Sequence, residues 1–143
     1  PVSAGGLEEQ LQVLLRLYQK EEVRLEFCNV SYEENGVLSE KPALLLPVDM
    51  ILYFEYIKTK KKVRIVTENM VYEYPDAISG LEGRMQPYGF ATSCRGILVN
   101  LKNVAKIKGY EVVLKNGVSV PLSQKRVAQF KERLNEYIHS SGE

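Results

Sequence analysis

The chain has 143 residues, of which 45% are hydrophobic and 26% are charged, and its formal net charge is +1. That length fits one ordinary domain, and the apolar share excludes a disordered tail, so we expect a packed core. No run approaches the ~18 consecutive apolar residues of a membrane span, and residues 1–6 lack the basic and apolar segments of a signal peptide.

The chain offers few groups for catalysis or metal binding. Its two cysteines, Cys28 and Cys94, lack metal-ligand spacing and favour a reducing, cytoplasmic setting, and the single histidine, His139, lies near the end of the sequence. No stretch resembles a glycine-rich phosphate loop or a nucleophile with an adjacent base, and the sequence gives no reason to pair carboxylates such as Glu55 and Glu73. We therefore predict no enzyme, no metal, no cofactor and no small-molecule substrate.

The small net charge conceals an uneven distribution. Residues 1–57 contain ten acidic and four basic side chains, whereas residues 58–143 contain eight acidic and fifteen basic side chains. The local charge, not the overall pI, is what a polyanion meets. By itself this asymmetry is equally consistent with a polyanion-binding face and with an ordinary solvated surface.

The first predicted element is an amphipathic helix over residues 7–20. Its apolar stripe recurs at alternating spacings of four and three residues, at Leu7, Leu11, Leu14 and Tyr18. Such a stripe packs on its own domain, which we favour, or forms a short coiled-coil seam between two copies. We therefore expect residues 1–22 to be an N-terminal helix or linker, serving in dimerisation or remaining from a longer protein, and residues 23–143 to be the main domain.

After residue 22 the pattern changes to that of strands. Alternating apolar residues over 23–27 predict a half-buried strand, and Asn35-Gly36 predicts a turn. The apolar runs 43–46 and 50–54 predict a strand covered on both faces. Further strands are expected over residues 63–66 and 71–74, joined by residues 67–70.

The second half of the sequence predicts more strands between two helices. A short helix is expected within residues 75–85, strands across 96–107, and a hairpin around Asn116-Gly117. A final helix capped by Ser123 shows an apolar face made of Val127, Phe130, Leu134 and Ile138. The chain is therefore predicted to be a mainly β single domain with short helices at its ends.

The first chemical signal is a basic cluster between two apolar strands. It consists of Lys58, Lys60, Lys61 and Lys62, followed by Arg64. Cations on a loop held by rigid strands bind nucleic acid well because neutralised phosphates release counterions. The alternative is a hydrated turn that keeps the protein soluble.

Two further basic features complete the set of candidate site residues. Arg95 enters an apolar strand, where its planar guanidinium can match guanine or a phosphate, or form a structural ion pair. Lys125 and Arg126 lie in the first turn of the last helix, where cations oppose the helix dipole unless an anion docks there.

Taken in order, these segments resemble the LytTR family of bacterial DNA-binding domains. Residues 48–55 resemble the family's "DIxYxE" strand, residues 90–101 its "FxRxHRSxLVNL" signature, and residues 114–126 its hairpin and "PxSRR" ending. The resemblance implies a β-rich domain whose loops enter the major grooves of promoter DNA. It places the DNA contacts around Lys61, at Arg95, and at Lys125 with Arg126.

The sequence departs from the family pattern in the central signature. The usual "HRS" is Cys94-Arg95-Gly96 here, and Thr92 replaces an arginine. An arginine beside a cysteine can lower the thiol pKa, which suggests redox sensing, although a thiol packed in the sheet is the more common case.

We therefore predict a cytoplasmic, bacterial transcription regulator that binds duplex DNA, either as the output domain of a two-component response regulator or as a stand-alone protein. Two rival hypotheses remain. One is a protein-interaction module that uses the acidic N-terminal part, and the other is a general binder of RNA or anionic membranes.

Overall fold

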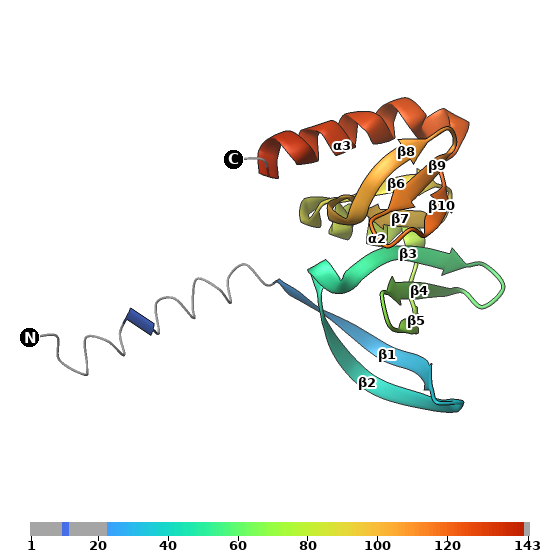
Figure 1. The fold of residues 1–143 in the computed structure, drawn as a ribbon. Helices are drawn as coiled ribbons and strands as arrows, with labels where there is room; N and C mark the ends of the chain where they lie inside the picture. The colour runs from blue at the N-terminus through green and yellow to red at the C-terminus, as the bar shows by residue number, and fades with distance from the viewer. Residues whose placement is uncertain (1–9, 12–22, 142–143) are drawn as a thin grey trace, which may run out of the picture.

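The computed structural model describes residues 10–11 and 23–141, and its architecture is mainly β (Figure 1). The strands are β1 (Arg24–Glu34), β2 (Val37–Pro47), β3 (Ile51–Ile57), β4 (Lys62–Thr67), β5 (Val71–Pro75), β6 (Phe90–Cys94), β7 (Ile97–Asn100), β8 (Val104–Lys108), β9 (Glu111–Leu114) and β10 (Ser119–Pro121). The helices are α2 (Ile78–Met85) and α3 (Val127–Ser141), with 3-10 turns η1 (Val48–Met50), η2 (Gln86–Tyr88), η3 (Leu101–Asn103) and η4 (Gln124–Arg126). The predicted fold class is confirmed, whereas the helix predicted over residues 7–20 lies largely outside the described residues.

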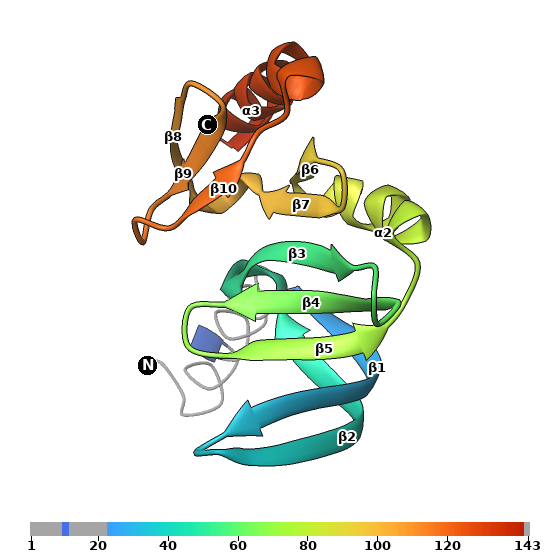
Figure 2. The same ribbon diagram turned by 90° about the vertical axis from the view of Figure 1, so that its right-hand side faces the viewer.

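The strands form two antiparallel sheets. The larger has the order β2-β1-β5-β4-β3-β7-β6, and the smaller has the order β10-β9-β8. Figures 1 and 2 show the smaller sheet and α3 on the β7–β6 side of the molecule, with the β1–β2 hairpin on the opposite side. Both predicted asparagine-glycine turns are present, since residues 35–36 join β1 to β2 and residues 115–117 lie between β9 and β10.

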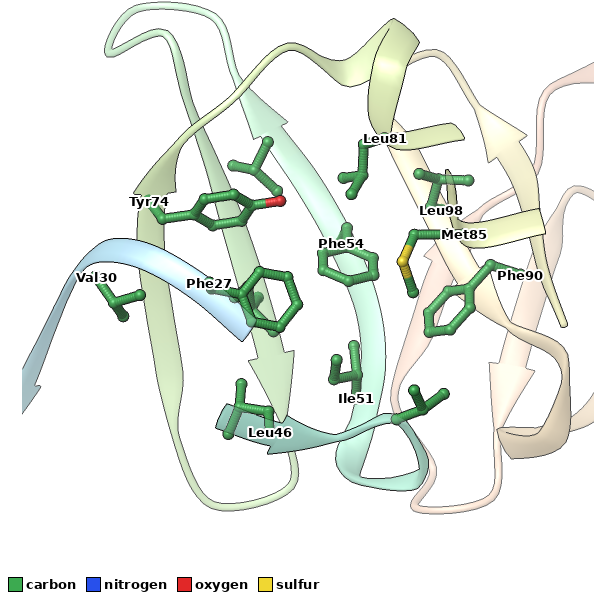
Figure 3. Packing of buried hydrophobic residues seen from close by; sticks show 13 residues of the cluster. Phe27, Val30, Leu46, Ile51, Phe54, Tyr74, Leu81, Met85, Phe90 and Leu98 are labelled. Atoms are coloured by element: carbon green, nitrogen blue, oxygen red, sulfur yellow. The ribbon is translucent and has the colours of Figure 1, made fainter. Parts of the chain in front are cut away.

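One hydrophobic core fills the concave side of the larger sheet beneath α2. Phe54 lies at its centre, with ring centroids 6.0 Å from Phe27 and 5.3 Å from Phe90 (Figure 3). Leu81 and Met85 of α2 close this core, so the short helix predicted within residues 75–85 is confirmed despite its glycines. The first core therefore joins β1, the middle of the sheet and α2.

A second core lies on the other face of the same sheet. Its buried side chains include Val99 of β7, Leu114 of β9 and Phe130 of α3. Leu122, which follows β10, is buried there as well. Leu98, next to Val99, belongs to the first core, so β7 is covered on both faces. This second core attaches the smaller sheet and α3 to the larger sheet.

A backbone irregularity lets β1 contribute two side chains to one core. Phe27 and Val30 are both buried, although residues three apart in a regular strand face opposite sides. Asn29 lies between them with φ of +57°, and asparagine tolerates this left-handed conformation better than most residues. The simple alternation predicted from residue 23 therefore ends at Asn29.

Three details of the predictions are wrong. The run 43–46 is not covered on both faces, because Leu45 is 56% exposed on the edge strand β2, and Met50 is 47% exposed in η1. The rest of the second run is covered on both faces as predicted, since Ile51 and Phe54 lie in the first core and Leu52 lies in the second. The Ser123 side chain makes no capping hydrogen bond, since the chain first forms η4 and becomes α-helical only at Val127. Ile138 is 52% exposed because Tyr137, and not Ile138, is the residue of this turn that packs on the second core.

Truncating Phe27 tests whether β1 is an integral part of the domain. Phe27→Ala removes a ring that is 6% exposed and packs on Phe54 and Tyr74. We expect the free energy of unfolding to fall by about 3–5 kcal/mol in urea titrations. Leu45→Ala on the adjacent strand is the matched control, with an expected change within about 0.5 kcal/mol. Equal effects of the two substitutions would contradict the role assigned to β1.

Candidate nucleic-acid interface

The lysine cluster lies on the tight turn between β3 and β4. Residues 58–61 form this turn, and Lys62 begins β4. The Lys60 N–H donates a hydrogen bond of 3.2 Å to the Ile57 carbonyl, and Lys61 has φ of +53°. The side chains of Lys58, Lys60 and Lys61 are exposed. A short, hydrogen-bonded turn thus presents several ammonium groups from a well-anchored hairpin.

Arg95 lies on a second turn immediately beside the first. The turn between β6 and β7 consists of Arg95 and Gly96, and Gly96 has φ of +85°, which suits glycine. The Tyr56 N–H donates a hydrogen bond of 2.8 Å to the Gly96 carbonyl, so the turn is attached to β3 two residues before Lys58. Arg95 itself is exposed and is not buried against a carboxylate.

The start of the last helix joins the same end of the sheets. The Ser123 N–H donates a hydrogen bond of 2.8 Å to the Ser93 carbonyl, two residues before Arg95. Lys125 is exposed and Arg126 is partly exposed within η4. Figures 1 and 2 show the β3–β4 turn and the start of α3 on the same side of the molecule. The structure therefore brings together three basic features that lie far apart in the sequence, and we call residues 58–62, Arg95, Lys125 and Arg126 the basic surface.

The predicted site residues differ in whether their charges are already paired. Arg64 lies on β4 with Nη1 2.9 Å from Glu55 Oε1 and Nη2 3.8 Å from Glu73 Oε2. Lys60 Nζ lies 3.3 Å from Glu73 Oε1. Across the described part of the chain, six of the predicted side chains make neither a hydrogen bond nor an ion pair: Lys58, Lys61, Lys62, Arg95, Lys125 and Arg126.

The sequence did not reveal that two carboxylates, Glu55 and Glu73, form ion pairs with predicted site residues. Glu55 and Glu73 flank Arg64 because the three residues are in register on adjacent strands, β3, β4 and β5. Alternation places them on one face of each strand, but only the strand order makes them neighbours. The two carboxylates hold Lys60, which is part of the basic surface, and Arg64, which lies beside it on β4.

Cys94 does not have the properties of a reactive thiol. Burial raises its pKa above the ordinary value, although the positive charge of Arg126 acts in the opposite direction. Reactive thiols instead have a lowered pKa. The redox-sensing hypothesis, which assigned the lowering to Arg95, is therefore not supported, and the common alternative of a thiol packed in the sheet fits better.

Residues 10–11 and 23–141 contain neither a cluster of metal ligands nor a helix that could span a membrane. No three histidine, cysteine, aspartate or glutamate side chains gather there in an arrangement that could hold a metal ion. No helix within those same residues is long and apolar enough to cross a membrane.

Comparison with known proteins identifies the family. The sequence model of the "LytTr DNA-binding domain" matches residues 42–135. The chain belongs to the LytTR family. This family is defined by DNA binding and not by catalysis, so residues 42–135 form a DNA-binding domain, and the resemblance noted in the sequence is confirmed.

A solved structure supports the same fold. It is the LytTr DNA-binding domain of a Bacillus cereus protein described as a methyl-accepting/DNA response regulator. The two chains superpose with a TM-score of 0.58 at 19% identity, over 74% of this chain and 96% of the other. No curated protein matches the sequence.

Neutralising Glu73 tests whether this LytTR domain restrains two of its own cations. Glu73→Gln removes the partner of Lys60 and one partner of Arg64, so both become freer to meet phosphate. We expect affinity for random duplex DNA to rise by about two- to fivefold, with a steeper dependence on salt, as measured by fluorescence anisotropy. The control is Glu68→Gln, which makes the same charge change on the exposed turn at the other end of β4 and should leave the affinity unchanged. If both variants bind equally well, the restraint by Glu73 is ruled out.

Proposed function

We propose that this chain is a sequence-specific transcription regulator that binds duplex DNA through the basic surface. The main support for this proposal is a pair of backbone hydrogen bonds. They connect the β6–β7 hairpin to the β3–β4 hairpin on one side and to the segment before η4 on the other. Unpaired cations on three adjacent, anchored turns match a polyanion in charge. Rigid turns also lower the entropic cost of ordering those side chains when DNA binds.

The proposal assigns different roles to the different cations. Lys58, Lys61 and Lys62 contact phosphates or base edges, and Lys125 with Arg126 engages backbone phosphates at the start of the last helix. Arg95 reads a base in the major groove, because a guanidinium pairs with guanine through two hydrogen bonds. Lys60 and Arg64 act mainly by positioning the hairpin, since Glu55 and Glu73 hold them.

Sequence specificity is tested by substituting Arg95. Duplexes selected from a random pool by the purified protein define its recognised site. Arg95→Ala should weaken binding to that site by about 1–3 kcal/mol and change binding to random DNA little, because only a base contact distinguishes sequences. Lys115→Ala, on the exposed turn between β9 and β10, serves as the control and should change neither affinity.

The same assay separates the rival functions. Equal losses on selected and random DNA would remove the base-reading role from Arg95. Binding to RNA or anionic vesicles as strong as to duplex DNA would favour the general polyanion binder. A protein-interaction module predicts that none of the basic substitutions alters function, whereas deletion of residues 1–20 abolishes it.

We further propose that residues 23–143 form the DNA-binding unit and that residues 1–22 act separately. The solved relative is described as part of a response regulator, which supports an output domain. A stand-alone regulator is the alternative, and either protein would act in the bacterial cytoplasm. Self-association would use the stripe of Leu7, Leu11, Leu14 and Tyr18.

Sedimentation equilibrium tests this second proposal. If the stripe forms a seam between two copies, the chain sediments as a concentration-dependent dimer, and combining Leu11→Glu with Leu14→Glu yields a monomer. Replacing Gln10 and Gln12 by Glu adds the same charge to the same segment outside the stripe and should leave the dimer intact. A monomeric unmodified chain would contradict self-association through this segment.

A further inference from the structure

The turn between β8 and β9 is hydrogen-bonded to the segment that leads into η4. The Leu122 N–H donates a hydrogen bond of 2.9 Å to the Tyr110 carbonyl, and Leu122 immediately precedes Ser123, which is attached to Ser93. Strand pairing gives the same placement, because Glu111 is opposite both Lys108 and Pro121. A continuous set of hydrogen bonds thus connects this turn to η4 and to the β6–β7 turn.

The turn carries two exposed side chains without partners in the described structure. Tyr110 is 59% exposed, and Lys108 is exposed at the end of β8. Neither side chain makes a hydrogen bond or an ion pair with a described residue, and Lys108 forms none with Glu111 opposite to it. Gly109 has φ of +60°, so a tight turn holds the Tyr110 backbone in place.

These two side chains have complementary chemistry for a phosphodiester backbone. A lysine ammonium neutralises a phosphate and releases a counterion, and a tyrosine hydroxyl donates a hydrogen bond to a phosphate oxygen. Such contacts set the position and orientation of a protein on DNA without reading sequence. An exposed tyrosine with no internal partner is well suited to this role, since its rigid ring loses little entropy on binding.

We infer that Lys108 and Tyr110 form an additional backbone clamp, which grips the DNA strand beside the segment engaged by Lys125 and Arg126. This inference rests on the proposed function, because it extends the basic surface across the smaller sheet. The clamp adds affinity and fixes the orientation of the domain, whereas Arg95 supplies the specificity.

Salt titrations of the full chain test the clamp, with the selected duplex and a random duplex as probes. Lys108→Ala should reduce the slope of log K against log salt concentration by about 0.9, the value for one lost phosphate contact. Tyr110→Phe should leave that slope unchanged and weaken binding by about ten- to hundredfold, as expected for one lost hydrogen bond to a charged phosphate oxygen. Both losses should be equal on the two duplexes, because a backbone contact carries no sequence information.

Lys115→Ala is the matched control for Lys108→Ala. Lys115 is an exposed lysine of the same sheet at the opposite end, where its N–H bonds to the Asn103 carbonyl far from the basic surface. If Lys108→Ala and Lys115→Ala give the same slope as the unmodified chain, the clamp is overturned while DNA binding stands. If the unmodified chain shows no preference for duplex DNA, the proposed function itself fails, independently of the clamp.

Discussion

The arrangement of the proposed interface depends on two backbone hydrogen bonds made by one short hairpin. Gly96 accepts from Tyr56 on one side of the β6–β7 turn, and Ser93 accepts from Ser123 on the other. The turn that presents Arg95 is therefore fixed at once to the central strand β3 and to the start of the last helix. Because backbone groups make both bonds, they do not depend on the side chains at Thr92 and Cys94, two of the positions where this sequence departs from the family pattern.

The charges near this hairpin fall into two groups with different consequences. Arg64 and Lys60 are satisfied by Glu55 and Glu73, so their charges help to set the geometry of the hairpin. The side chains of Lys58, Lys61 and the two cations of η4 have no such partners within the described residues. Unpaired like charges repel one another, which disfavours the folded protein alone and is relieved when a polyanion neutralises them. This distribution is what a DNA-binding domain requires.

The N-terminal hairpin completes a core that the matched residues do not fill alone. The family match begins at residue 42, within β2, and leaves β1 outside. Phe27 and Val30 of β1 are nevertheless buried against the centre of the larger sheet. The structural unit is thus larger than the matched segment, and it keeps its acidic N-terminal strands on the β2–β1 side of the sheet, away from the β7–β6 side that carries Arg95 (Figure 2).

Features that depend on neighbours along the chain could be predicted from the sequence. The turns at Asn35-Gly36 and Asn116-Gly117, the alternation of β4, the short helix α2 and the three groups of basic residues were all visible as local patterns. The break in the alternation of buried and exposed residues along β1 also has a local cause, because it occurs at Asn29, whose φ angle is positive.

The tertiary structure alone decided which charges are free, because ion pairs depend on strand register and not on distance along the sequence. Arg64 meets Glu55 nine positions away and Lys60 meets Glu73 thirteen positions away, through strand pairings that no local pattern specifies. The same reason explains why Ser123 contributes its backbone N–H and not its hydroxyl, why burial raises the Cys94 pKa, and why Tyr110 lies next to η4. Each of these facts is set by segments that become neighbours only when the sheets assemble.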